Sequence, residues 1–413
     1  MKFVFIVPDS PFLIDEKVFP FLGPLYLSAV LKKEGHEVKV VDLAGVAYLS
    51  GYYGQEIPQL EADYIGITAT TPQFPRAVQI ANILKQRNPQ QKVMIGGPHA
   101  SANPEECKKY FDFVCVGEGE RFVQYLTAFK PTVCDWGMSF PYIDDLDDIP
   151  FPDWDAIDLS QYHYFIDGKR TMNILTSRGC PYACAFCSKA PWGQRIRYRS
   201  AENVIEEIGL LRIRGYEGLM LYDDEFFLNE KRDIEIVLGL GAAGMVWRCF
   251  SRADVIMKHA DLIKAAAANG LREMLIGCES GSNSILDNVN KGTKTWMNEE
   301  AIDFLKSQGV RVKAALIVGL PGETPDTIKA TERFVERVKP DSVDFTVLRV
   351  LPGSDIWKHP EKYNLKFSPE YKPYKTKPGE YEAGVSTSNM TAREIVEARD
   401  YLDKKFNPHL WSK

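Results

Sequence analysis

Short apolar runs alternate with stretches of helical spacing along most of this chain, and that order limits the possible folds more than any other feature. In the first third, strands are predicted at Lys2–Val7, Glu37–Leu43, Tyr64–Thr68, Lys92–Ile95 and Phe113–Val116. The helical stretches between and after them are Gly23–Lys33, Arg76–Arg87, a short one from Pro104, and Arg121–Phe129. Continuous apolar strands joined by helices form parallel sheets that are covered on both faces. Residues 1–135 are therefore predicted to form a doubly wound, Rossmann-like α/β domain.

The alternation resumes at Thr171, with a repeat of about 25 to 35 residues that fits one β/α unit each. Its strands are predicted at Met172–Thr176, Gly218–Tyr222, Met245–Phe250, Glu273–Gly277, Val312–Val318 and Val343–Leu348. Six units are too few for a closed barrel of about eight, so residues 171–350 are predicted to form a partial (β/α)6, TIM-like barrel. The acidic, proline-rich residues 136–170 read as a linker. Residues 351–413 are predicted to be a short C-terminal extension that ends in a helix at Ala392–Phe406.

The charge balance disfavours nucleic acid as a partner. The chain has 50 Lys and Arg against 56 Asp and Glu in 413 residues, a net charge of −6, so no overall positive field would attract phosphate backbones. The first apolar run, Phe3–Val7, is broken by Pro8 and is too short for a signal sequence. No run approaches the roughly 18 apolar residues of a membrane span. We therefore expect a cytoplasmic protein without a membrane partner.

Three of the eight cysteines, Cys180, Cys184 and Cys187, follow the first predicted barrel strand directly. Barrels of this kind carry catalytic residues in the loops at the C-terminal ends of their strands. In a reducing compartment, such a cluster indicates metal binding or redox chemistry rather than disulfides. A closed zinc site needs four ligands, whereas three thiolates on an iron–sulfur cluster leave one iron open to a reacting ligand. The iron–sulfur cluster is the favoured interpretation, with zinc and three unliganded thiols as the alternatives.

The CxxxCxxC spacing after the first strand of a partial barrel resembles the radical S-adenosylmethionine superfamily. This resemblance implies a catalytic 4Fe–4S cluster on Cys180, Cys184 and Cys187, with S-adenosylmethionine on its open iron. Reductive cleavage of the sulfonium would yield a 5′-deoxyadenosyl radical. It also implies an electron donor, such as a flavodoxin or a ferredoxin.

Four further residues are implied contacts of S-adenosylmethionine. Phe186 matches the aromatic position that packs on the adenine. Asp224, Arg252 and Glu279 follow successive predicted barrel strands, and an acidic or a forked basic side chain suits the ammonium, hydroxyl and carboxylate groups of such a ligand. Ordinary loop packing, local salt bridges and helix caps are the alternative roles of these four residues.

The N-terminal domain lacks a GxGxxG after its first strand and lacks a GK[ST] loop, which disfavours dinucleotides and nucleoside triphosphates. The segments GPLYLSAVLKKEGHEVKVVD, GGPHA and VGEGE instead resemble the cobalamin-binding domain that precedes the barrel in one large radical S-adenosylmethionine subfamily. The DxHxxG element that supplies an axial histidine in other cobalamin proteins is absent, as is common in this subfamily. The resemblance implies cobalamin contacts at Thr68, Thr70, Gly96, Gly97, His99, Gly117 and Glu118. For His99, a turn or helix-capping role is the alternative.

Together the two resemblances imply an enzyme that methylates an unactivated carbon of a small-molecule or peptide substrate. The radical would remove a hydrogen atom, and the carbon radical would take the methyl group that cobalamin carries. A second hypothesis keeps the radical without methyl transfer, as in a rearrangement, dehydration or cyclisation. A third is a non-catalytic scaffold that retains the fold, and the presence of all three clustered cysteines argues against it.

Overall fold

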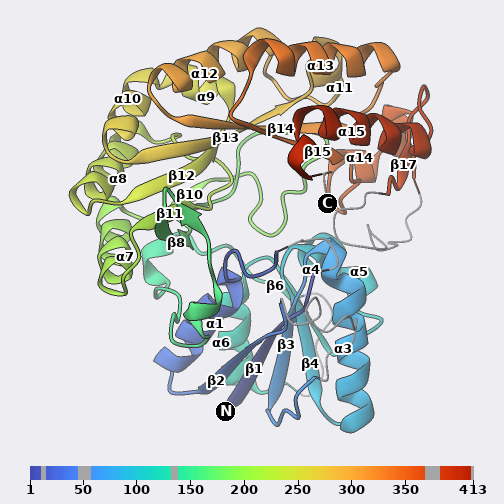
Figure 1. Cartoon of the computed structure of the whole chain (residues 1–413). Coiled ribbons are helices and arrows are strands. Elements are labelled where there is room, and N and C mark those ends of the chain that lie inside the picture. Colours follow the sequence, from blue (N-terminus) through green and yellow to red (C-terminus); the bar gives the residue numbers. More distant parts are fainter. Residues whose placement is uncertain (11–14, 45–56, 132–137, 368–381, 411–413) are drawn as a thin grey trace. The chain divides into compact units, whose positions relative to one another are not determined.

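The computed structural model describes residues 1–10, 15–44, 57–131, 138–367 and 382–410 (Figure 1). These residues form two compact units. The first unit holds Met1–Tyr164 and Ser188–Gly193, and the second holds Phe165–Cys187 and most of the chain from Gln194 onward. Among the described residues, no helix is both long enough and apolar enough to cross a membrane.

The first unit is built on a six-stranded sheet with the order β2-β1-β3-β4-β5-β6. All of its pairs are parallel. The strands are β1 (Lys2–Val7), β2 (Glu37–Asp42), β3 (Tyr64–Thr68), β4 (Lys92–Gly96), β5 (Phe113–Val116) and β6 (Met138–Ser139). Strand β1 pairs with both β2 and β3, so the strand order reverses there, and ligands of doubly wound sheets bind at the carboxyl ends near such a switch point. The predicted doubly wound domain is confirmed.

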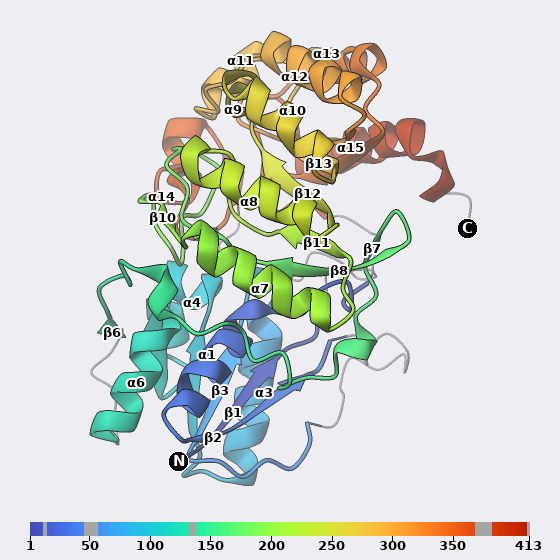
Figure 2. The ribbon, with the colours of Figure 1, turned by 90° about the vertical axis from the view of Figure 1, so that its left-hand side faces the viewer.

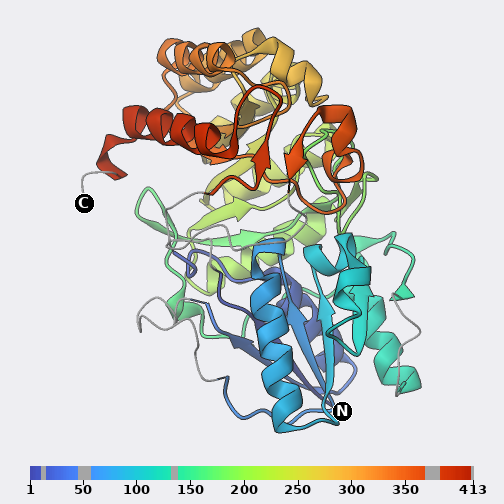
Figure 3. The same ribbon diagram turned by 90° about the vertical axis from the view of Figure 1, so that its right-hand side faces the viewer.

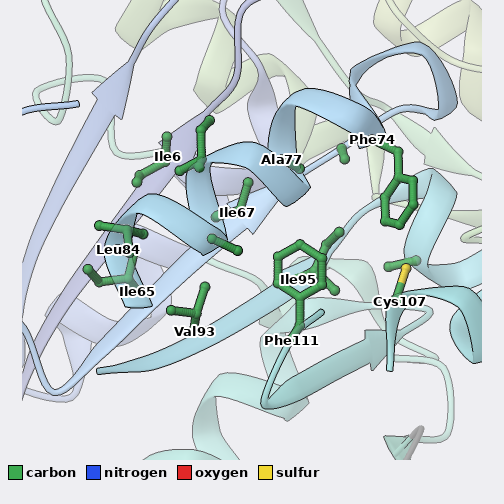
Figure 4. Close-up of a cluster of buried hydrophobic side chains, with 14 of the residues drawn as sticks. Ile6, Ile65, Ile67, Phe74, Ala77, Leu84, Val93, Ile95, Cys107 and Phe111 are labelled. Carbon is green, nitrogen blue, oxygen red and sulfur yellow. The ribbon is translucent and has the colours of Figure 1, made fainter. Parts of the chain in front are cut away.

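Helices cover both faces of this sheet. Helices α1 (Leu22–Lys33) and α6 (Gly119–Phe129) lie together on one face (Figure 2), and α3 (Phe74–Arg87) lies on the other (Figure 3). The apolar face of α3 packs on β3 and β4 (Figure 4). The buried residues of the helix include Phe74, Ala77, Ala81 and Leu84, which have the spacing of one helical face. Two short helices that complete the unit are α4 (Pro98–Ala102) and α5 (Pro104–Cys107).

The second unit is built on a seven-stranded sheet with the order β15-β14-β13-β12-β11-β8-β7. The six predicted barrel strands are present and parallel. They are β8 (Lys169–Ile174), β11 (Gly218–Leu221), β12 (Val246–Ser251), β13 (Leu271–Glu279), β14 (Arg311–Val318) and β15 (Ser342–Val347). The seventh, β7 (Phe165–Ile166), pairs antiparallel with β8 at the edge and was not predicted.

The helices of this unit follow the outer side of the curved sheet (Figure 1). They are α7 (Ala201–Ile213), α8 (Glu230–Ala242), α9 (Ala253–Lys258), α10 (Ala260–Ala268), α11 (Asn283–Asn288), α12 (Thr295–Ser307) and α13 (Pro325–Val338). In β14, Val312, Ala314, Leu316 and Val318 are buried, and the residues between them are partly exposed. Side chains alternate between the faces of a strand, so one face packs under the helices and the other lines an open inner wall. The predicted partial barrel is confirmed.

The described residues after position 350 belong to the second unit. Helix α15 (Ala392–Phe406) packs on β14 and β15 (Figure 3). The Arg399 guanidinium donates to the carbonyl of Phe345 at 2.9 Å, and the Asn407 side-chain amide donates to the carbonyl of Val343 at 2.9 Å. Before α15 come α14 (Asp355–Lys358) and the short antiparallel pair β16 (Lys366–Phe367) and β17 (Val385–Ser386).

The predicted linker, residues 136–170, differs from the structure because much of it is folded onto the first unit. Besides β6, the partly exposed Asp153 accepts from Ser28 Oγ at 2.5 Å and pairs with Lys32 at 2.7 Å. Near its end, Tyr162 donates to Asp42. The acidic composition that suggested a connector therefore supplies carboxylates for contacts to the domain, and β7 then opens the second unit.

Candidate active site

The three clustered cysteines lie on the loop that follows β8. A small antiparallel pair, β9 (Ser177–Arg178) and β10 (Arg197–Tyr198), closes the ends of this loop. All three cysteines are reduced, outside any disulfide, and partly exposed. Within the described part of the chain, no group of three or more His, Cys, Asp or Glu is arranged to hold a single metal ion. The donor set fits a larger group, because three reduced thiols on one short loop are the ligands that an iron–sulfur cluster uses.

The loop is anchored on both sides of its second cysteine. The N–H of Ala185 donates to the carbonyl of Val289 at 2.8 Å, and the carbonyl of Ala185 accepts from Ile356 at 3.1 Å. On the other side, the Asn290 side-chain amide donates to the carbonyl of Ala183 at 3.0 Å. These bonds leave little freedom to the backbone of the cysteine between them.

Arg252, which follows β12, brings a positive charge to this loop. Its guanidinium lies 3.7 Å from the centroid of the Tyr182 ring, and its Nη1 is 3.6 Å from the Cys184 sulfur. Asp254 pairs with it at 3.0 Å. Burial disfavours the charged guanidinium, but Asp254 and the Cys184 sulfur outweigh this and hold the pKa of Arg252 above its usual value. A cation beside a thiol favours the thiolate that binds metal.

Three successive carboxylates follow β11, and the structure divides their roles. Asp223 is buried and accepts from Thr176, at 2.6 Å from the backbone N–H and 2.5 Å from the hydroxyl. Glu225 is buried and accepts from Ser251 Oγ at 2.5 Å, and burial raises its pKa to about 7. Asp224 between them is exposed. Asp223 and Glu225 therefore hold neighbouring strand ends together, and the predicted Asp224 is the carboxylate that faces solvent.

Glu279 ends β13 in an unusual conformation. Its φ is +61°, in the left-handed region that disfavours most side chains, and the pairing of β13 with β14 shifts register at this point. Its carboxylate pairs with Lys291 at 2.7 Å, and both side chains are nearly buried. Strain of this kind persists where surrounding contacts enforce it, often at functional sites. The sequence prediction missed Lys291, since one lysine in an Asn-Lys-Gly turn carries no periodic signal.

Two further residues lie on the barrel rim, by which we mean the loops at the C-terminal ends of the barrel strands. Phe186 is half-buried on the cysteine loop, where the predicted adenine contact remains a prediction. Glu323, after β14, is buried and accepts from the backbone N–H groups of Gly319 at 2.5 Å and Leu320 at 3.3 Å. Burial raises its pKa to about 7.

In the first unit, the structure brings the predicted loops together at the carboxyl edge of the sheet. The N–H of Ala69 donates to the carbonyl of Gly96 at 3.1 Å, which joins the loop of Thr68 and Thr70 to the loop after β4. Gly117 donates to Ser101 Oγ at 3.0 Å, which adds the loop after β5. Five of the seven residues predicted to contact cobalamin are partly exposed, namely Thr68, Thr70, Gly96, Gly97 and Gly117.

Gly97 fills a position that no larger residue fits. Its φ is +93°, and a Cβ atom there would lie 2.8 Å from Thr68 Oγ1. Contacts under 3.0 Å force a neighbour to move. The absence of a side chain therefore keeps the loops after β3 and β4 in contact.

His99 and Glu118 have interior positions instead. The imidazole of His99 is fully buried, stacks on Phe74 with ring centroids 4.0 Å apart, and has Nδ1 3.2 Å from Thr71 Oγ1. Burial lowers its pKa to about 4, so the ring is neutral. The buried Glu118 accepts from the N–H of Ile143 at 2.8 Å. Pro98 begins α4, and this helix turns His99 onto Phe74 of α3. Both side chains therefore support the loops from the interior of the unit.

Comparisons with known proteins agree with this architecture. The chain matches the Radical SAM superfamily over residues 174–335 and the B12 binding domain over residues 16–126. It is 31% identical over 403 residues to a protein described as an uncharacterized methyltransferase of Pyrococcus horikoshii, covering 91% of this chain and 86% of that protein. It is 29% identical to an anaerobic magnesium-protoporphyrin IX monomethyl ester cyclase of Rubrivivax gelatinosus, covering 80% of this chain and 64% of the cyclase.

Among solved structures, the cobalamin-dependent S-adenosylmethionine radical enzyme OxsB has the same fold, with a TM-score of 0.76 at 19% identity over 98% of this chain and 67% of OxsB. The radical SAM domain implies a 4Fe–4S cluster and S-adenosylmethionine, and the B12-binding domain implies cobalamin. Those are the cofactors that the sequence predicted. The chain belongs to the family of cobalamin-dependent radical S-adenosylmethionine enzymes.

Proposed function

We propose that this chain is a C-methyltransferase that acts on an unactivated carbon of a small-molecule substrate. The observation that carries the proposal is the cysteine loop itself, where three reduced cysteines share one anchored loop and Nη1 of Arg252 lies 3.6 Å from the Cys184 sulfur. The full-length similarity to a protein described as a methyltransferase supports the choice of reaction.

When bound, the cluster and S-adenosylmethionine supply the radical, and cobalamin supplies the methyl group. The three cysteines hold the cluster. Arg252 keeps a positive charge beside one sulfur, while Asp224 and Glu279 offer carboxylate oxygens to ammonium or hydroxyl donors. The partly exposed loops of the first unit offer small side chains and backbone N–H groups to a large ligand.

The open inner wall of the barrel suits an apolar part of a substrate. Phe250, Leu275 and Ile317 lie on the side of their strands that the helices do not cover, and each is partly exposed. Tyr222 is 48% exposed and meets Phe250 edge to face at 5.9 Å between centroids. Sites for small molecules are mostly apolar, and an apolar wall excludes water from a reactive centre. A carbon without activating groups fits such a wall.

The second candidate is radical cyclisation without methyl transfer. The similarity to the Rubrivivax gelatinosus cyclase favours it, although the chain spans only 64% of the length of that protein.

The test is anaerobic reconstitution with iron, sulfide and cobalamin, followed by incubation with reduced flavodoxin, methyl-deuterated S-adenosylmethionine and a small-molecule extract. We expect 5′-deoxyadenosine, S-adenosylhomocysteine and a product that carries the deuterated methyl group. Release of 5′-deoxyadenosine with no labelled product would favour cyclisation. If protein that holds both cofactors releases neither 5′-deoxyadenosine nor S-adenosylhomocysteine, this result would contradict methyl transfer and cyclisation alike and favour a non-catalytic scaffold.

A further inference from the structure

Lys291 is a buried cation at the point where several parts of the barrel rim meet. Its ammonium is 2.7 Å from Oε1 of Glu279, and the two side chains are only 6% and 9% exposed. The residues on either side are left-handed, with φ of +51° at Asn290 and +78° at Gly292. Left-handed residues on both sides of one lysine define a tight bend, which fixes the direction of its side chain.

The turn Val289–Gly292, which carries Lys291, also fastens the cysteine loop. Its hydrogen bonds to Ala183 and Ala185 flank the second cysteine. A Cβ atom on the last residue of the turn would lie 3.3 Å from Nη2 of Arg252. One turn of four residues therefore connects the cysteine loop, the Arg252 guanidinium and the Glu279 carboxylate.

The pair with Lys291 uses one oxygen of Glu279. Among the described residues, no donor contacts the second oxygen, Oε2. Burial opposes the charged form of Lys291, but Glu279 and then Cys184 stabilise it, so the pKa of the ammonium lies above its usual value. An anchored carboxylate with one oxygen left over is an acceptor that is already oriented for a donor group.

We propose that Lys291 is a positioning residue, which holds Oε1 of Glu279 and thereby presents Oε2 to S-adenosylmethionine. Because the turn that carries Lys291 is also bonded to the cysteine loop, it keeps the Glu279 carboxylate in a fixed position relative to that loop. The inference rests on the proposed function, because it takes Glu279 as a contact of this cofactor. Residues that orient a ligand contact, without touching the ligand, commonly change affinity when they are replaced.

Lys291→Met tests the inference, with Lys294→Met as its matched control. Lys294 lies on the same segment and pairs with Asp287, but the two side chains are 38% and 60% exposed. The readouts are iron content, the Kd for S-adenosylmethionine by equilibrium dialysis, and the change that this ligand causes in the electron paramagnetic resonance spectrum of the reduced cluster. We expect Lys291→Met to keep its iron but bind at least ~10-fold more weakly, with a smaller spectral change. Lys291→Arg restores binding, and Lys294→Met matches the wild type.

Equal affinity and equal spectra for the wild type and Lys291→Met would overturn the inference. A wild-type cluster whose spectrum does not respond to S-adenosylmethionine would instead contradict the proposed function. If Lys291→Met loses its iron, the change is made together with Glu279→Gln, which removes the unpaired buried charge. We then expect the double variant to bind as weakly as Glu279→Gln alone, because Lys291 acts through Glu279. An additional loss in the double variant would overturn the inference.

Discussion

The two units place their ligand loops at the same kind of edge, the carboxyl ends of a parallel sheet, but they hold those loops in different ways. In the barrel, ion pairs between charged side chains add to the backbone hydrogen bonds of the cysteine loop, with the Lys291–Glu279 pair at 2.7 Å and the Arg252–Asp254 pair at 3.0 Å. In the first unit, the loops after β3, β4 and β5 are joined to one another by backbone groups and the Ser101 hydroxyl, and Gly97 lies against Thr68.

The difference fits the chemistry of the cofactors that the two domains imply. A charged zwitterion such as S-adenosylmethionine needs fixed charges around it, and buried ions must themselves be paired. A large cofactor such as cobalamin needs close approach of the backbone over a wide area, which small residues allow. The barrel rim is therefore sensitive to single charges, and the rim of the first unit is sensitive to added volume.

The largest expected effect is loss of the cluster from the barrel without loss of cobalamin from the first unit. Cys184→Ala removes a cluster ligand, so we expect loss of bound iron and no release of 5′-deoxyadenosine, while uptake of cobalamin stays close to the wild type. Iron analysis and the absorbance spectrum measure both. Cys249→Ala, at a buried cysteine of β12 outside the cysteine loop, is the control and should keep its iron. Loss of cobalamin from Cys184→Ala would show that the rims are not independent.

The next effect tests sensitivity to volume. Gly97→Ala places a methyl group 2.8 Å from Thr68 Oγ1, whereas Gly35→Ala has the same left-handed backbone, with φ of +81°, and nothing within 4 Å. We expect Gly35→Ala to lower the free energy of unfolding by about 1 kcal/mol and to leave cobalamin uptake unchanged. Gly97→Ala should cost about 2–3 kcal/mol and reduce cobalamin uptake, measured by absorbance after desalting. Equal uptake by the two variants would argue against a tight approach of this loop to the cofactor.

The smallest effect is a pH dependence of opposite sign in the two units. The pKa of Glu323 rises from 4.5 to about 7 on folding, so unfolding releases a proton and stability falls as the pH rises through this window. The pKa of His99 falls from 6.5 to about 4, so unfolding takes up a proton and stability falls as the pH drops through that window.

Thermal unfolding of Glu323→Gln and His99→Phe between about pH 5 and about pH 7 measures these contributions. Relative to Glu323→Gln, the wild type should lose on the order of 2 kcal/mol as the pH rises across this range. Relative to His99→Phe, it should lose on the order of 2 kcal/mol as the pH falls. Parallel curves for the wild type and either variant would mean that the group does not titrate as its burial implies.

The sequence predicted the scaffold well because the scaffold depends on apolar runs. Strands β1 and β3 begin and end at the predicted residues, and the six barrel strands occur in the predicted order. The thiols were also predictable, since three cysteines at fixed spacing after a strand form a strong local pattern.

The sequence did not predict the contacts that depend on tertiary structure. Lys291 lies twelve residues after Glu279, and only the bend between them makes the pair. His99 follows Gly-Gly-Pro in a loop and resembled a ligand, but α4 turns it into the core beneath α3. Of the three carboxylates after β11, only burial distinguishes Asp224 from its two neighbours.

The alternation along the barrel strands has a consequence for substitutions. On β13, Met274 and Ile276 are 0% exposed beneath the helices, so changes there leave cavities or overpack the interior. Leu275, between them, is partly exposed on the inner wall. A substitution at such a wall position can change the surface of the inner wall and leave the packing under the helices intact.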